Sequence, residues 1–230
     1  MKHSWQTAPA RGERQHYAQR IEWRWYNRFL PQAWRLTGTR VPQEEWWSWQ
    51  GMDVHLDRFS HPAPRVLVIM LHGGGGNGRV LMMPGALVQQ LGAEVVAPDL
   101  PGFGLTAGHG LRDVSYDRWA DLVADLVRSE AERSGLPVVL FGMSLGGLLA
   151  YGSAARAPQV SGVIATTLVD TRTLPSFRTI ARARLLGALS YALLPLLPPL
   201  LRGLRLPMRW VAPMHLITND PDFSALFSRD

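Results

Sequence analysis

Apolar residues along this chain fall into two alternating patterns, which predict strands and helices in turn. Short continuous apolar runs at 66–71 and 136–140 are typical of strands that are buried on both faces. Residues 79–91, and those that follow the serine cap Ser115, space their apolar side chains at the helical period. This alternation predicts an α/β fold, a mostly parallel sheet with helices on both faces. The predicted strands span residues 45–49, 53–59, 66–71, 94–98, 136–140 and 160–169.

The first two predicted strands, 45–49 and 53–59, are joined by a turn at Gln50 and Gly51. The second of them alternates polar and apolar residues, as a half-buried strand at the antiparallel edge of a sheet does. We therefore expect residues 53–59 to form an edge strand with one face in water.

The residues ahead of the sheet, 1–44, are expected to form an N-terminal helical extension. Within it Tyr17, Ile21, Trp25 and Phe29 recur close to the helical period, with arginines between them. We expect an amphipathic helix that packs on its own domain, with weak contact to a membrane surface as the alternative. The first residues of the chain lack the apolar stretch of a secretory signal, so we expect a cytoplasmic protein.

The net charge of +6 comes from one stretch of the chain. Seven arginines and no acidic residue lie between Thr171 and His215, so the remainder is close to neutral. With a single lysine and no basic groove pattern, nucleic acid is not an expected partner. The absence of cysteine excludes disulfides, thiol catalysis and thiolate metal sites.

Ser144 lies between the strand 136–140 and an apolar helix, with Gly142 two residues before it and Gly146 two residues after it. Glycine at both positions lets the backbone turn so tightly that a side chain would clash there. Such a nucleophile elbow lifts a serine hydroxyl over the positive end of the following helix. A plain Gly/Ser turn between strand and helix has the same local pattern, so this stretch alone leaves both interpretations open.

A second glycine-rich loop, from His72 to Asn77, follows the strand 66–71. Such a loop can cradle a phosphate, but the lysine and hydroxyl residue of a nucleotide-binding loop are missing, and neither glycine fingerprint for nucleotides fits. Parallel strands end at one edge of a sheet. This loop and Ser144 are therefore expected together at the edge where ligands bind in open α/β folds.

Three motifs occur in one order, each at the end of a strand: His-Gly-Gly-Gly at 72–75, Asp-Leu-Pro-Gly-Phe-Gly at 99–104 and Gly-Met-Ser-Leu-Gly-Gly at 142–147. With them the chain resembles the serine hydrolases of the α/β-hydrolase fold, close to the esterase and monoacylglycerol-lipase-like branch. The resemblance covers about residues 45–170, the expected α/β-hydrolase core. It is far more specific than any one of the motifs.

This resemblance implies that Ser144 attacks the carbonyl of a small-molecule ester and forms an acyl-enzyme. The backbone amides of Leu145 and of Gly74 or Gly73 would hold the oxyanion, with no metal or organic cofactor. It also implies that His72 supports its loop as a structural residue. The Asp that begins the second motif, Asp99, matches a position that shapes the loop at the pocket entrance.

The resemblance ends where the fold supplies its remaining catalytic residues. Hydrolases of this fold place the acid after the seventh strand and the histidine after the eighth, whereas here the sixth strand is followed by a cap-like segment, 171–230. His215 is the only histidine after Ser144, and it lies in this segment. Asp170 ends the sixth strand and is either the acid or a loop-capping residue. Both stay candidates for the triad.

We therefore expect a truncated hydrolase that lacks its last strands and its catalytic histidine and has little activity. Its last strand, 160–169, would be an unprotected apolar edge through which the chain could associate with itself. The apolar stretch 185–201, broken by prolines, is expected to be a lid over the site or a helix that merely buries its leucines. Two alternatives to a serine hydrolase stay open: a catalytically silent protein that binds a small apolar ligand in the same pocket, and a peripheral membrane protein.

Overall fold

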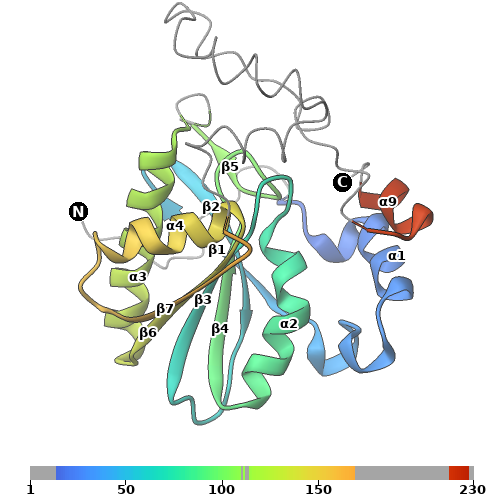
Figure 1. Ribbon diagram of the computed structural model, residues 1–230, viewed down its shortest axis with the longest axis horizontal. Coiled ribbons are helices and arrows are strands. Elements are labelled where there is room, and N and C mark those ends of the chain that lie inside the picture. Colours follow the sequence, from blue (N-terminus) through green and yellow to red (C-terminus); the bar gives the residue numbers. More distant parts are fainter. Residues whose placement is uncertain (1–13, 110, 112–113, 169–217, 228–230) are drawn as a thin grey trace, which may run out of the picture. The chain divides into compact units, whose positions relative to one another are not determined.

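The structure is a computed structural model, and it describes residues 14–109, 111, 114–168 and 218–227. The chain divides into two units, Met1–Leu168 and Val169–Asp230, and each is described by itself. The first unit holds a sheet of parallel and antiparallel strands with helices on both faces (Figure 1). The predicted α/β fold class is therefore confirmed.

The sheet has the strand order β1-β2-β4-β3-β6-β7. Parallel pairing joins β4, β3, β6 and β7, whereas β1 and β2 are antiparallel to their neighbours. The predicted turn between β1 and β2 is present, and Gln50 and Gly51 have the positive φ values, 46° and 79°, that a two-residue hairpin turn requires. The sequence pattern did not predict the short strand β5, which pairs with β2. The strands are β1 (Gln43–Trp49), β2 (Met52–Phe59), β3 (Val66–Leu71), β4 (Ala93–Pro98), β5 (Ala107–Gly108), β6 (Val138–Met143) and β7 (Val160–Thr166).

Helix α2 covers one face of the sheet, and helices α3 and α4 cover the other (Figure 1). The predicted serine cap starts α3, where Ser115 Oγ accepts a hydrogen bond from the Arg118 amide at 3.2 Å. Gly135 ends the same helix in the left-handed conformation, with φ of 66°. The helices described in this unit are η1 (Tyr17–Gln19), α1 (Ile21–Phe29), η2 (Gln32–Trp34), η3 (Gly38–Arg40), α2 (Gly78–Gln90), α3 (Tyr116–Ser134) and α4 (Leu145–Ala154), where η marks a 3₁₀ turn.

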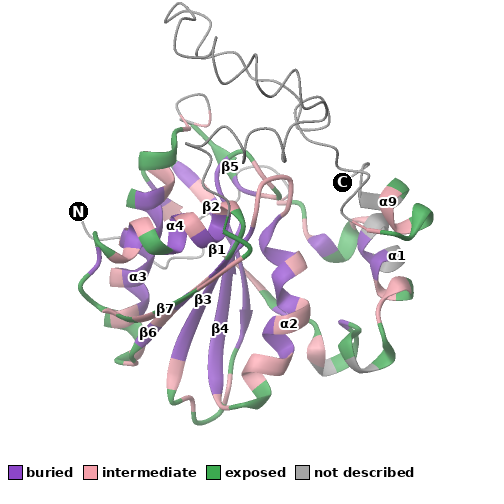
Figure 2. Cartoon of the chain, in the orientation of Figure 1, coloured by how far each residue is buried: buried purple, intermediate pink, exposed green. Residues whose placement is uncertain are grey.

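Two apolar clusters lie between the sheet and its helices. Figure 2 shows the buried residues of the central strands and of the helices beside them. The larger includes Trp47 and Trp49 of β1 and Leu122 of α3, all of them fully buried. The smaller lies between the sheet and α2 and includes Met70 and Met82. Because both faces of the central strands are covered, β3 carries the continuous apolar run seen in the sequence.

The prediction that residues 53–59 form a half-buried edge strand is wrong. Strand β2 lies between β1 and β4, and all of its residues but one are buried. Its polar side chains are buried together with partners: Asp57 pairs with Arg79, and Arg58 pairs with Glu130. The polar positions of this strand therefore contact other charged groups and not water.

The N-terminal segment before the sheet forms a single turn and a helix. After the single turn η1, helix α1 begins at Ile21, and Trp23 and Tyr26 are among its buried residues. Tyr17 of η1 is fully buried, with its ring edge-on to those of Trp23 and His55. The segment packs on its own domain through these aromatic residues, as predicted.

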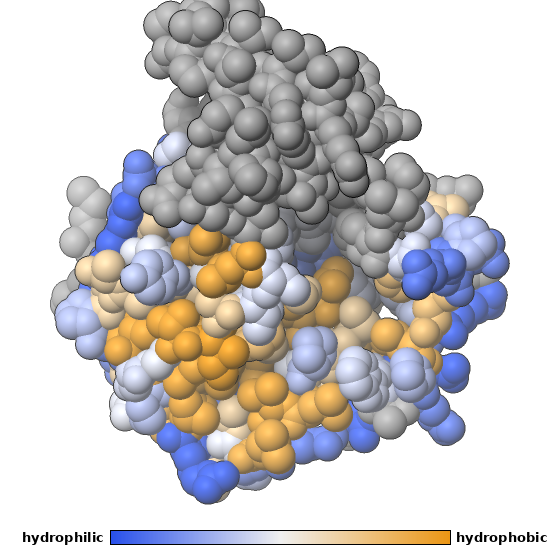
Figure 3. All heavy atoms as spheres, in the orientation of Figure 1, coloured by the Kyte–Doolittle hydropathy of each residue, from blue (hydrophilic) through white to orange (hydrophobic). Residues whose placement is uncertain are grey.

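Strand β7 is the last strand in the described sheet order, where it pairs with β6. Two of its apolar side chains are accessible, with Val163 37% and Ile164 52% exposed. Figure 3 shows apolar side chains gathered over the part of the surface where β6 and β7 lie in Figure 1. Self-association through this edge stays a prediction.

In the second unit the structure describes residues 218–227. Helix α9 (Pro221–Phe227) is preceded by Asp220, whose Oδ1 accepts hydrogen bonds from the amides of Asp222 at 2.9 Å and Phe223 at 3.0 Å. This carboxylate caps the start of the helix. Within the described residues of the whole chain, every helix is too short or too polar to cross a membrane.

Candidate active site

Ser144 lies in the tight turn between β6 and α4. Its backbone has φ of 56° and ψ of −120°, and a conformation of this kind costs a residue other than glycine about 1–3 kcal/mol. Its amide donates to the carbonyl oxygen of Thr166 and to Oγ1 of Thr167, each at 3.0 Å. Ser144 is exposed, although Gly142 and Gly146 on either side of it are buried. The turn thus presents the serine at the carboxyl edge of the parallel strands.

Glycine is required on both sides of this turn because neighbouring backbone comes too close for a side chain. A Cβ atom at Gly142 would lie 2.1 Å from the carbonyl oxygen of Gly146, and one at Gly146 would lie 2.0 Å from that of Leu71. Helix α4 therefore packs directly against the ends of β3 and β6. This is the steric reason that the sequence motif predicted.

Two backbone segments meet beside Ser144. Leu145 is the first residue of α4, and the first amides of a helix have no intrahelical partner. From the other side comes Gly73, where a Cβ atom would lie 3.3 Å from Ser144 Cβ and 3.9 Å from its Oγ. The loop that carries Gly73 and Gly74 is closed by a hydrogen bond from the Gly76 amide to the Gly73 carbonyl oxygen at 3.2 Å. The structure thus brings Leu145 and the glycine loop together at the serine.

His72 uses both ring nitrogens to hold the loops around it. Its Nε2 accepts a hydrogen bond from the Leu100 amide at 3.0 Å, so Nδ1 carries the proton and donates it to the Gly73 carbonyl oxygen at 2.8 Å. The residue is buried, and burial lowers the pKa of its imidazole. A neutral ring with both nitrogens occupied is unsuited to act as a general base, which agrees with the structural role predicted for it.

Asp99 is fully buried at the end of β4 and connects three segments of the chain. Its Oδ1 accepts a hydrogen bond from the amide of Gly78, the first residue of α2, at 2.6 Å. Its Oδ2 accepts from the Leu105 amide at 2.7 Å and from the Tyr17 hydroxyl at 2.8 Å. Burial would raise the pKa of Asp99, but the neighbouring His55 and the amides of Leu105 and Gly78 hold it below its usual value. The carboxylate thus shapes this loop, as expected.

Behind Asp99 lies a group of charged residues that the sequence pattern did not predict, and we call it the loop-side cluster. Arg79 binds both carboxylate oxygens of Asp57 at 2.6 Å and lies 3.0 Å from Glu44. His55 Nδ1 lies 3.1 Å from Asp99 Oδ2, and its Nε2 lies 3.2 Å from Glu44 Oε2. The loop-side cluster consists of Glu44, His55, Asp57, Arg79 and Asp99.

These charges shift the pKa values of their neighbours. Burial would lower the pKa of His55, but Asp99 and Glu44 outweigh it and raise the pKa to about 9. Burial would raise the pKa of Glu44, but His55 and Arg79 hold it at about 2. For Asp57 burial dominates over Arg79, and the pKa rises to about 6. At neutral pH His55 is therefore a cation that lies between two carboxylates.

On the opposite face of the sheet a second group of charges joins β1, β2 and β4 to the end of α3. Its centre is Arg58, which binds Glu94 and Glu130 at 2.5 Å each and Glu45 at 2.9 Å. Arg58 and Glu130 are buried, whereas the side chain of Arg133 is 34% exposed. We call this group the helix-side cluster; it consists of Glu45, Arg58, Glu94, Glu130 and Arg133.

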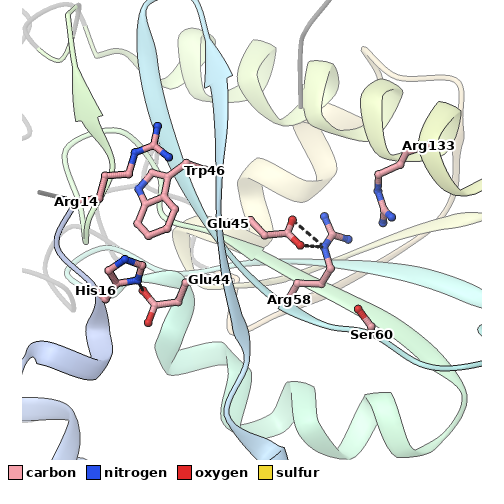
Figure 4. A pocket seen from close by; sticks show the side chains of 8 residues that line it. All are labelled: Arg14, His16, Glu44, Glu45, Trp46, Arg58, Ser60 and Arg133. Carbon is pink, nitrogen blue, oxygen red and sulfur yellow. Dashed lines mark hydrogen bonds and ion pairs between the residues drawn. The ribbon is translucent and has the colours of Figure 1, made fainter. Parts of the chain in front are cut away.

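A cavity of about 570 Å³ opens beside β1 and is bordered by both clusters (Figure 4). Figure 4 shows Glu44 and Trp46 on one side of the strand and Glu45 with Arg58 on the other. The guanidinium of Arg14 lies over the Trp46 ring, 5.1 Å from its centroid. Ser144 is not among the lining residues, so this cavity is separate from the serine site. Its lining is Arg14, His16, Glu44, Glu45, Trp46, Arg58, Ser60 and Arg133.

Two predicted catalytic residues, Asp170 and His215, lie outside the described residues, as does the predicted lid at 185–201. Within the part of the chain that the structure describes, no group of His, Cys, Asp or Glu is arranged to hold a metal ion. Of the predicted site residues, the structure shows Gly73 close to Ser144, with Leu145 next to the serine at the start of α4.

Comparison with known proteins gives the family. A model of the alpha/beta hydrolase family matches residues 68–229, which is well over half of the chain. The chain belongs to the alpha/beta hydrolase family. The match begins within β3 and includes the His72 loop, the Asp99 loop and the Ser144 turn.

Two relatives of this alpha/beta hydrolase match its sequence in part. It is 37% identical over 113 residues to Esterase Rv0045c of Mycobacterium tuberculosis (strain ATCC 25618 / H37Rv). The aligned residues cover 49% of this chain and 35% of the relative. It is 30% identical over 105 residues to Protein phosphatase methylesterase 1 of Mus musculus, which covers 45% of this chain and 27% of the relative. The chain thus spans much less than half the length of either relative.

The likeness extends to solved structures. The alpha/beta hydrolase GrgF from Penicillium sp. sh18 has a TM-score of 0.51 and 20% sequence identity, with 60% of this chain and 50% of that chain covered. At this identity the likeness concerns the fold alone. It supports the α/β-hydrolase arrangement of strands and helices described above.

Proposed function

We propose that this alpha/beta hydrolase cleaves carboxylic esters of small molecules through an acyl-enzyme on Ser144. The observation that carries the proposal is the backbone of Ser144, an exposed residue held at φ of 56° between β6 and the start of α4. Such strain persists only where the surrounding structure enforces it, and it is concentrated at functional sites. The names of the two relatives, an esterase and a methylesterase, support an ester as the substrate.

In the proposed reaction the Ser144 oxygen attacks the ester carbonyl carbon, its proton passes to a general base, and the carbonyl oxygen becomes an oxyanion. The amides of Leu145 and of Gly73 or Gly74 donate hydrogen bonds to this oxyanion, and each such donor contributes a rate factor of about 10²–10³. The intermediate then expels the alcohol, which takes the proton from the base. Water attacks the remaining acyl-enzyme in the same way and releases the acid.

His215 and Asp170 are the candidates for the base and its acid, because they follow Ser144 in the chain order of this fold, although they lie outside the strand ends where the fold places these residues. His72 is unsuited because both of its nitrogens are occupied, and His55 is held between two carboxylates. Loss of turnover in both Asp170→Ala and His215→Ala would support the assignment. Background turnover in the parent, unchanged in both variants, would instead support a triad that lacks its histidine.

The nucleophile is tested by Ser144→Ala, with a fluorophosphonate probe and p-nitrophenyl acetate as substrate. The substitution removes one exposed hydroxyl, so the fold should be kept, while labelling should disappear and kcat should fall by several orders of magnitude. Ser153→Ala is the matched control, because it removes a buried hydroxyl from helix α4 and should leave labelling unchanged. Hydrolysis by Ser144→Ala within about tenfold of the parent would refute the nucleophile. A parent chain that takes up no probe would favour the silent ligand-binding alternative.

A further inference from the structure

Tyr17 enters the domain from the N-terminal segment and is fully buried beside the loop-side cluster. Its hydroxyl donates to Asp99 Oδ2 at 2.8 Å, and its amide donates to Glu44 Oε2 at 3.1 Å. Its ring lies under the guanidinium of Arg79, which is 4.8 Å from the ring centroid, and edge-on to Trp23. Tyr17 is therefore held through its ring, its backbone and its hydroxyl.

Asp99 accepts the hydrogen bond from this hydroxyl, and it controls the position of the loop that follows β4. Besides Tyr17 it holds the amide of Leu105, at the far end of the loop, and the amide of Gly78, at the start of α2. The Thr106 hydroxyl in turn donates to the Asp99 carbonyl oxygen at 2.6 Å. A hydrogen bond to an ionised, buried carboxylate is among the stronger ones in a protein, so each of these donors helps to fix the loop.

The same loop connects to the residues beside the nucleophile. Leu100, which follows Asp99, donates its amide to His72 Nε2 at 3.0 Å, and His72 Nδ1 donates to the Gly73 carbonyl oxygen at 2.8 Å. Gly73 lies so close to Ser144 that a Cβ atom there would be 3.3 Å from Ser144 Cβ. A continuous series of contacts thus leads from Tyr17 to the glycine loop.

We propose that Tyr17 is a positioning residue for the amide donors of the glycine loop, which makes the N-terminal segment a working part of the active site. The inference rests on the proposed function, since it assigns Tyr17 a role in that same reaction. Tyr17 touches neither substrate nor reacting atoms. It acts through Asp99, Leu100 and His72.

The expected effect follows from the geometry of oxyanion stabilisation. Without the Tyr17 hydroxyl, Asp99 loses one donor, and the Leu100 amide that fixes His72 is held less firmly. A catalytic group displaced by about 1 Å can lower the rate by about 10²-fold, and here the displacement is indirect and smaller. We therefore expect kcat to fall by about tenfold, with little change in KM, because the oxyanion forms only in the transition state.

The test compares Tyr17→Phe with Tyr26→Phe in the full chain, with p-nitrophenyl acetate as substrate. Both variants remove a hydroxyl from a buried tyrosine of the N-terminal segment, and the hydroxyl that donates to Asp99 Oδ2 is that of Tyr17. Tyr17→Phe should lower kcat and keep KM, while Tyr26→Phe should keep both. Equal kcat in the two variants, at matched melting temperatures, would overturn the inference.

A second measurement needs no turnover. The exchange rate of the Leu100 amide, measured by NMR, reports the hydrogen bond to His72 directly. We expect Leu100 to exchange at least about tenfold faster in Tyr17→Phe than in Tyr26→Phe. If the parent hydrolyses no ester, the proposed function fails by itself. The exchange rate of the Leu100 amide then tests the positioning role of Tyr17 alone. Unchanged protection of Leu100 would then overturn the inference.

Discussion

Two neighbouring residues of β2 belong to the two buried charge clusters of this hydrolase, one to each. The clusters differ in which parts of the chain they hold together. Asp57 points to one face of the sheet and joins Arg79 in the loop-side cluster. Arg58 points to the other face and joins Glu94 and Glu130 in the helix-side cluster. The first reaches the loops around Ser144, whereas the second ties strands to the end of α3.

The two clusters also differ in chemistry. The helix-side cluster is built from arginines and carboxylates, and arginine keeps its charge over the whole range in which proteins fold. The loop-side cluster contains His55, whose pKa is raised to about 9, and Asp57, whose pKa is raised to about 6. The loop-side cluster therefore contains two groups with pKa values of about 6 and about 9. The difference indicates that the helix-side cluster holds strands and helix together, whereas the charge of the loop-side cluster changes with pH.

Removal of Arg58 should have the largest effect on stability. Arg58→Met would take the central cation from the fully buried Glu130, and an uncompensated buried charge costs about 3–5 kcal/mol. Urea unfolding should show this loss as a lower midpoint at an unchanged slope. The rate of phosphonate labelling at Ser144 in the folded fraction should match the parent, because the ion pairs described for this cluster join β1, β2, β4 and α3. A loss below about 1 kcal/mol would mean that the remaining partners already satisfy Glu130.

The loop-side cluster should give a smaller but pH-dependent effect. The pKa of His55 rises from 6.5 to about 9 on folding, so its protonation stabilises the folded state. This contribution, about 3 kcal/mol, is fully present below pH 6.5 and is lost as the pH rises through 9. The unfolding free energy of the parent should therefore fall between these values.

The control for this prediction is His55→Gln, which keeps hydrogen-bonding capacity but cannot take up a proton. Its unfolding free energy should be lower than that of the parent at pH 6 and should change less between pH 6.5 and 9. A parent and variant with the same slope over that range would contradict the assigned pKa of His55.

The smallest effect is expected at the rim of the helix-side cluster. Arg133 is paired with Glu94 and Glu130, but a third of its side chain is in contact with water. Arg133→Gln should cost less than about 1 kcal/mol, and this cost should shrink in high salt because exposed ion pairs are screened. A loss as large as that of Arg58→Met, independent of salt, would show that the two arginines are equivalent.

Much of the fold could be predicted because periodicity and glycine placement report on local structure. The apolar run of β3, the cap at Ser115 and the glycines at the Ser144 turn each have a local physical cause. The burial of β2 could not be predicted in this way. Alternating residues such as His55 and Asp57 are typical of a water-facing side, and only long-range partners such as Arg79 explain their burial.

The site was predictable to a similar extent. The glycine motifs indicated that Ser144, Leu145 and the loop of Gly73 would meet, since parallel strands end at one edge. The hydrogen bond of Tyr17 to Asp99 was missed, because Tyr17 was assigned to a helical stripe and the contact spans 82 positions of sequence. One signal was present: an aromatic residue that carries a polar group needs a partner once it is buried.

The conformation of Ser144 also has a consequence for how this hydrolase can change over generations. A position with φ of 56° suits glycine better than any other residue, so replacing the proposed nucleophile by glycine would relieve strain in the backbone. Selection for stability alone works against the serine, and selection for turnover keeps it. In a lineage that no longer needs the reaction, we therefore expect the serine to be replaced early, because its loss stabilises the fold. The surrounding sheet and loops would persist.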